Sequence, residues 1–107
     1  MQDTKAECKS TVTVTIALKD GIVHCTPDCV YMRRGQNIEW KCEGDFPFAV
    51  HLGYDSPFER EQYHAPRQQR IRLDLANDAR YGRYKYVVAI FDGEKVWIED
   101  PQIIIRR

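Results

Sequence analysis

Cysteine and histidine are the residues of this 107-residue chain whose types and spacing could do chemistry. Cys8, Cys25, Cys29 and Cys42 are even in number, which suits up to two disulfides in an exported domain. The same count suits a reduced protein with buried or metal-bound thiols. Cys25 and Cys29 are separated by three residues, a spacing found in zinc sites, and His24 adjoins them. The cysteines therefore define the first candidate site.

The elements that must position these thiols are strands. Thr11 to Leu18 alternates apolar and polar residues, which is typical of a half-buried strand. Further strands are predicted over Val30–Met32, Asn37–Cys42, a segment with Phe48, Val50 and Leu52 inward, Arg70–Leu75, Tyr84–Phe91, and a final strand or strand pair reaching Ile105. Asp92-Gly93 predicts a turn. Residues 54–69 predict a long connection with one helical turn near Phe58–Tyr63. The pattern indicates an all-β sandwich.

Length and composition limit the function classes. We expect one domain over residues 1–107, with residues 1–10 as a polar lead-in. Acidic and basic residues number 16 each, so the zero net charge argues against nucleic acid as a partner. No apolar run reaches the roughly 20 residues of a membrane span. The compartment stays open: cytoplasmic if Met1 is the native start, periplasmic or exported if a leader was trimmed.

A set of spaced residues resembles the cupredoxin family, the plastocyanin and azurin type. The shared pattern consists of Gly35, Ile38 and Trp40, then Asp45 and Pro47, and later Gly82, Tyr84 and Tyr86. It extends over most of the chain, from Thr11 to Arg107. The resemblance implies a Greek-key β-sandwich of about seven to eight strands. In that family the sandwich holds a copper ion for electron transfer.

The copper ligands do not carry over to this sequence. A blue copper centre takes two imidazoles and a thiolate, usually with a weak axial methionine. The family's first histidine follows the proline that enters the fourth strand, where this chain has Pro47-Phe48. The remaining ligands belong in and after the Gly-x-Tyr-x-Tyr strand, which here continues as Val87 to Asp92. We therefore expect a cupredoxin-like domain without a type 1 copper site and without a cofactor.

The implied topology also bears on the thiols, because its first and third strands run parallel. Cys25, Cys29 and Cys42 would then lie near one another at one pole, with His24 beside them. Three interpretations stay open: disulfide-bonded or simply buried cysteines, a structural zinc ion, and a redox or metal-carrying pair at Cys25 and Cys29. Cys8 would start the first strand, at the opposite pole from Cys42.

Arginine and tyrosine gather in the second half of the chain, and both are favoured at protein interfaces. The candidate interface residues are Arg60, Tyr63, Arg67, Arg70, Tyr81 and Arg83. A catalytic triad, a pair of catalytic carboxylates and a phosphate-binding glycine loop are all missing from the pattern. We therefore expect a binding or interaction module, with another protein as the possible partner, and not an enzyme. The alternative is a thiol redox or metal-handling protein that uses Cys25, Cys29 and Cys42.

The alternating segments also predict the core of the sandwich. Its expected members are Val12, Val14, Ile16, Ile38, Trp40, Val50, Leu73, Tyr86, Val88 and Ile104.

Overall fold

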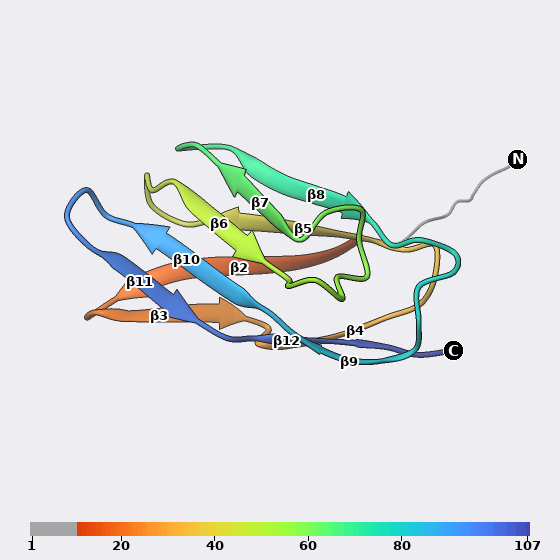
Figure 1. The fold of residues 1–107 in the computed structure, drawn as a ribbon. Helices are drawn as coiled ribbons and strands as arrows, with labels where there is room; N and C mark the ends of the chain where they lie inside the picture. Colours follow the sequence, from red (N-terminus) through yellow and green to blue (C-terminus); the bar gives the residue numbers. More distant parts are fainter. Residues whose placement is uncertain (1–10) are drawn as a thin grey trace, which may run out of the picture.

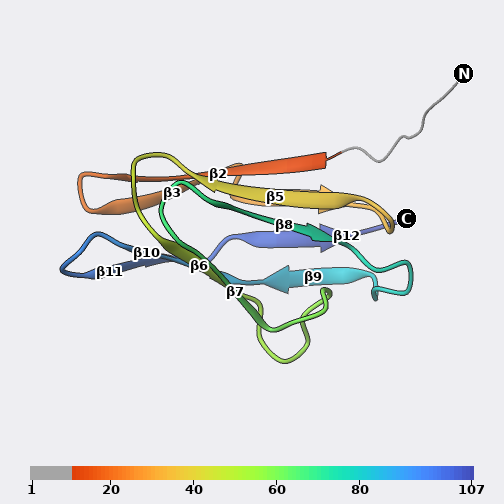
Figure 2. The same cartoon turned by 90° about the horizontal axis from the view of Figure 1, so that it is seen from above.

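The computed structural model describes residues 11–107 as two layers of β-strands (Figures 1 and 2). One layer is the sheet β3-β2-β5-β8, formed by β2 (Thr11–Lys19), β3 (Ile22–Thr26), β5 (Asn37–Cys42) and β8 (Arg70–Asp74). The other layer contains the sheet β11-β10-β6-β7, formed by β6 (Phe48–His51), β7 (Gln62–Ala65), β10 (Val87–Phe91) and β11 (Val96–Glu99). A third sheet has the order β4-β12-β9 and consists of β4 (Cys29–Met32), β9 (Gly82–Lys85) and β12 (Gln102–Ile105).

The strand pairing confirms the all-β sandwich that the sequence predicts. The first strand, β2, runs parallel to β5, with Val14 opposite Trp40. The C-terminal strand β12 runs parallel to β4, with Ile103 opposite Val30. These two pairings join segments far apart in the sequence. The described residues include no helix long and apolar enough to cross a membrane.

The connection over residues 54–69 differs from the prediction. The expected helical turn near Phe58–Tyr63 is wrong, because Gln62–Ala65 forms strand β7 on the edge beside β6. Tyr63 and Ala65 turn inward while Gln62 and His64 are exposed. This alternation has period two. Because the outer face carries a glutamine and a histidine, the segment is polar overall and its sequence does not indicate a strand.

The predicted core is mostly correct, with one residue out of phase. Ile103 and Ile105 are 0% and 2% exposed, whereas Ile104, the predicted core residue, is half-buried. Three consecutive isoleucines do not reveal which face is inward, and pairing with β4 and β9 decides it. Val12 and Leu73 pack against the core while half-buried. The other predicted core residues are buried.

Trp40 connects the two layers at the centre of the core. It is fully buried, and its ring packs edge-on against Tyr86 and Phe58 at centroid distances of 5.6 and 6.1 Å. Its Nε1–H donates a hydrogen bond of 3.0 Å to the hydroxyl of Tyr86. Burial raises the pKa of Tyr86, so this hydroxyl stays protonated. Tyr86 also separates β9 from β10, which the sequence predicts as one strand, and its N–H donates to the carbonyl of Pro101.

Replacing Tyr86 tests this buried bond. Tyr86→Phe keeps the ring packing but leaves the Trp40 N–H without its acceptor, so we expect a loss of about 1 to 3 kcal/mol in the free energy of unfolding. Chemical denaturation followed by tryptophan fluorescence measures it. Tyr31→Phe is the control, because Tyr31 is exposed and its ring contact with Arg106 survives the change. Equal stabilities for the two variants would contradict the assignment.

Candidate functional site

The structure places Cys25 and Cys42 at the same level of one sheet, but on opposite sides of strand β2. Cys25 of β3 and Cys42 of β5 both stand opposite Ile16, on either side of β2. Neighbouring strands lie about 4.8 Å apart, so the two Cα atoms are roughly 9.6 Å apart. A disulfide needs a Cα separation of about 4.4 to 6.8 Å. Cys25, Cys29 and Cys42 are free thiols, so the expected bridge to Cys42 is not formed. Cys8 lies outside the described residues.

The surroundings of the thiols disfavour redox or metal chemistry. Burial, followed by the nearby carboxylates of Glu99 and Asp28, raises the pKa of Cys25 to about 12. Burial also raises the pKa of Cys42. His24 is exposed between buried Val23 and Cys25, so its ring lies on the opposite face of β3. Over residues 11–107, no three side chains of histidine, cysteine or acidic residues form a group that could hold a metal ion.

The candidate interface residues contact different parts of the chain. Arg67 and Arg70 form ion pairs with Asp45 and Glu39, at 3.6 and 3.3 Å. Arg83 donates a hydrogen bond to Gln102. The guanidinium of Arg34 lies 4.0 Å from the ring centre of Tyr81. The hydroxyl of Tyr63 accepts a hydrogen bond from the backbone N–H of Arg60. The six residues thus have local partners in separate parts of the chain, and the interface they were expected to form stays a prediction.

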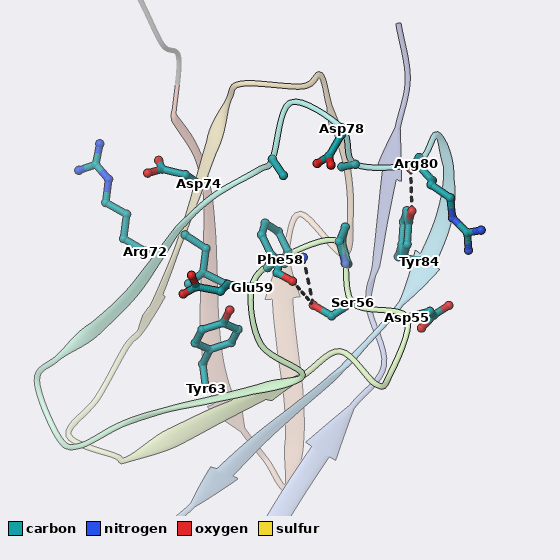
Figure 3. A pocket seen from close by; sticks show the side chains of 14 residues that line it. Asp55, Ser56, Phe58, Glu59, Tyr63, Arg72, Asp74, Asp78, Arg80 and Tyr84 are labelled. Atoms are coloured by element: carbon teal, nitrogen blue, oxygen red, sulfur yellow. Dashed lines mark hydrogen bonds between the residues drawn. The ribbon is translucent and has the colours of Figure 1, made fainter.

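The long connection after β6 forms one wall of a cavity of about 720 Å³ (Figure 3). Phe58, Tyr63 and Tyr84 give it aromatic walls, and the charged residues of its lining are Asp55, Glu59, Arg72, Asp74, Asp78 and Arg80. The side chains of Arg72 and Arg80 extend away from the centre of the cavity in Figure 3. The lining contains no histidine or cysteine. The cavity therefore offers aromatic and charged side chains that a ligand could contact.

The outer face of the sheet β11-β10-β6-β7 is unusually apolar. Val88, Ile90, Phe48 and Val50 point into the core, so the alternate residues of the same strands point to solvent. The outward residues on β6 and β7 include the polar His51, Gln62 and His64. We call the apolar outward residues the apolar face: Ala49, Val87, Ala89, Phe91, Val96 and Ile98. Ile98, Val96 and Phe91 are 66%, 64% and 46% exposed. An adjoining groove of about 400 Å³ is lined almost entirely by apolar side chains, with His64 at its edge.

The strand register orders this apolar face into rows. Ala89 stands between Ile98 of β11 and Ala49 of β6. In the next row, Phe91 pairs with Val96 and donates its N–H to the carbonyl of Pro47. Large side chains thus gather over β11 and the end of β10, and small ones lie over the middle of β10 and over β6. The run Val87 to Phe91, apolar on both faces, is the sequence signal for this surface, because a two-layer sandwich covers only one face.

Comparison with known proteins gives matches of structure alone. No family model and no curated protein matches the sequence. A purple cupredoxin from Nitrosopumilus maritimus superposes with a TM-score of 0.58 at 11% identity, covering 89% of this chain and 99% of that chain. A pseudoazurin from Sinorhizobium gives 0.56 at 12% identity, covering 92% and 76%. A reduced amicyanin variant gives 0.55 at 10% identity, covering 88% and 82%.

The fold is that of the cupredoxins. Pro47-Phe48 and Val87 to Asp92, the two stretches in which the family resemblance would place copper ligands, serve structural roles in this chain. Phe48 is 4% exposed and belongs to the core, as do Val88 and Ile90. Asp92, at the end of the second stretch, closes the hairpin between β10 and β11.

The Asp92 carboxylate is fully occupied by hydrogen bonds within this hairpin. Its Oδ1 accepts from the N–H groups of Glu94 and Lys95 at 2.8 Å, and its Oδ2 accepts from the Nε1–H of Trp97 at 2.7 Å. These bonds, with that from Lys95 the largest cause, lower the pKa of Asp92 from 3.8 to about 2. The carboxylate of Asp92 thus closes the turn between β10 and β11.

The lowered pKa of Asp92 predicts a pH-dependent stability. Because the ionised form accepts these bonds, its contribution is complete above the ordinary pKa of 3.8 and is lost as the pH falls toward about 2. We expect Asp92→Asn to lower the thermal midpoint at pH 7, and the gap to the unaltered protein to close between pH 4 and pH 2. Thermal melts across this range measure it, with Asp78→Asn as a control at an exposed carboxylate. A gap that is constant with pH would contradict the prediction.

The raised thiol pKa values predict slow alkylation. At pH 8, a thiol with a pKa of about 12 is ionised in roughly one molecule in 10,000, and only the thiolate reacts. Half-exposed Cys29 should therefore be alkylated by iodoacetamide well before Cys25, as followed by peptide mass spectrometry in the folded protein. Unfolding in denaturant should remove the difference. Recovery of a peptide cross-linked through Cys25 and Cys42 would show the thiol geometry to be wrong.

Proposed function

We propose that this protein is a binding module of the cupredoxin fold that docks a partner protein on its apolar face. The observation that carries the proposal is the exposure of Ile98, Val96 and Phe91 on one side of a sheet whose core side is already filled. Monomeric proteins rarely leave large contiguous apolar patches in water, and such patches mark interaction sites. The partner that fits is another apolar surface, since hydrophobic contact is the interaction this face can make.

Charges around the apolar face support the same proposal. No charged residue belongs to the face itself. At one end of the sheet Lys85 pairs with Asp100 at 3.4 Å, and at the other Arg67 pairs with Asp45 at 3.6 Å. Each of these rim charges is paired with an opposite charge. A partner that covers the rim would therefore not have to desolvate an unpaired charge. The zero net charge of the chain likewise provides no long-range attraction for an ionic partner.

The alternative function, thiol redox or metal handling, receives less support. It requires thiolates close together, but Cys25 and Cys42 stand on opposite sides of β2 with raised pKa values. Catalysis requires an activated group, and the cavity lining offers none. Binding through the apolar face requires only surfaces that are present in the folded chain.

Site-specific photo-crosslinking tests the proposed function. A photoreactive phenylalanine analogue at position 98 should give protein adducts in an extract of the source cells. The matched control is position 22, because Ile22 is also an exposed isoleucine, at 57%, on β3 of the other sheet. We expect adducts at position 98 and few at position 22, and Ala89→Arg should suppress them by placing a charge within the apolar face. Equal yields at the two positions would overturn the proposal.

A further inference from the structure

We infer that the partner docked on the apolar face is a second copy of this chain. The inference rests on the proposed function, because it names the partner of the same surface. A two-fold dimer uses one patch on both subunits, so the patch must be complementary to itself. A face that is uniformly bulky would not meet this condition. The apolar face meets it because its large and small side chains lie on opposite sides of one strand.

The strand that divides the two sides is β10. Ile98 and Val96 lie on its β11 side, and Ala49 and Pro47 lie on its β6 side. Both neighbouring strands are about 4.8 Å from β10, so the two sides are at equal distances from it. A two-fold axis parallel to β10 and passing over Ala89 therefore places β11 of each copy above β6 of the other.

This operation matches side chains row by row. Ile98, Ala89 and Ala49 share one row, so Ile98 of one copy lies over Ala49 of the other. In the next row, Val96 lies over Pro47, and Phe91 meets its own counterpart near the axis. Ala89 also faces its counterpart, and two methyl groups allow the sheets the close approach of roughly 10 Å seen in face-to-face packing. Ile98 and Val96 thus meet smaller residues across the interface, whereas Phe91 and Ala89 each meet their own counterparts.

Charges at the rim agree with this arrangement. The turn between β10 and β11 carries Glu94 and Lys95, and the matching position beside β6 carries the pair of Asp45 and Arg67. Each side presents one acidic and one basic residue, so the rotation can place opposite charges together and builds no array of like charges. Such a rim permits a second copy to approach although the two molecules are identical.

The size of the apolar face sets the expected strength of the dimer. Three strands and five residues span about 14 by 17 Å, or about 240 Å² on each copy and about 480 Å² on the two together, which is below the roughly 1,000 Å² expected of a stable complex and fits only weak association. We therefore expect a reversible dimer whose population rises with protein concentration and not a permanent one. A reversible dimer also leaves the monomer folded, so variants can be compared in the same fold.

Sedimentation velocity on the purified full chain tests the inference, from about 1 to about 500 μM, a range that brackets weak association. The unaltered protein should shift from monomer to dimer. Ile98→Lys should weaken association about tenfold or more by placing an ammonium over Ala49 of the other copy. Ile22→Lys, on the other sheet, should leave it unchanged. Circular dichroism confirms that each variant remains folded.

A charge pair at position 89 tests the axis itself. Ala89→Arg and Ala89→Glu should each be monomeric, because the axis brings two like charges together. An equimolar mixture of the two variants should recover a dimer, since arginine then faces glutamate. Recovery in the mixture would be unexplained if position 89 were merely near an interface.

The outcomes separate this inference from the proposed function. A monomer at every concentration, or a dimer insensitive to Ile98→Lys and Ala89→Arg, overturns the two-fold dimer. If the chain is monomeric while position 98 still gives adducts in the extract, the apolar face docks a different protein and only the inference of a second copy fails. If the chain is monomeric and adducts are equal at positions 98 and 22, both proposals fail.

Discussion

The hydrogen bond between Trp40 and Tyr86 is the interaction on which the arrangement of the second layer depends. It lies in the fully buried centre and joins β5 in one layer to the junction of β9 and β10 in the other. Tyr86 donates its backbone N–H to the carbonyl of Pro101, and this bond continues the antiparallel register that joins β9 to β12 and β10 to β11. On its other side β10 pairs with β6. The register of β10 sets the outward direction of Ala89 and Phe91.

The residues at Pro47-Phe48 and at the end of β10 stabilise the fold. Phe48 lies in the core, and the carboxylate of Asp92 accepts hydrogen bonds from the N–H of Lys95 and from the indole of Trp97. A side chain held by three hydrogen bonds has little freedom to take up another role. What remains at this end of the sandwich is apolar surface. Function on such a scaffold depends on the residues placed upon it and not on the scaffold itself.

Much of the fold could be predicted from the sequence, because period-two alternation is a local property that a single segment displays. The strand over Asn37–Cys42 has the predicted bounds for this reason. The phase of Ile103–Ile105 and the strand Gln62–Ala65 could not be predicted, since each depends on a pairing partner distant in the sequence. The bridge to Cys42 could not be judged from the sequence for a related reason: Cys25 and Cys42 lie at one level, but only the strand pairing reveals that β2 runs between them. The sequence shows that Val87 to Phe91 is apolar on both faces. Only the two-layer architecture reveals which of the two faces is exposed to solvent.

The parallel pairing of β12 with β4 has a consequence for how the chain folds. β4 lies in the first third of the described residues and β12 is the last strand, so this ladder closes a loop that contains most of the sandwich. Contacts of such long range are entropically costly to form early, and proteins rich in them fold on timescales of roughly milliseconds to seconds. Among the described strands β4 pairs with β12 alone, so it has no strand partner until the C-terminal strand reaches it. The last strand of the chain thus supplies the pairing for one edge of β4, while the other edge stays at the border of the sheet.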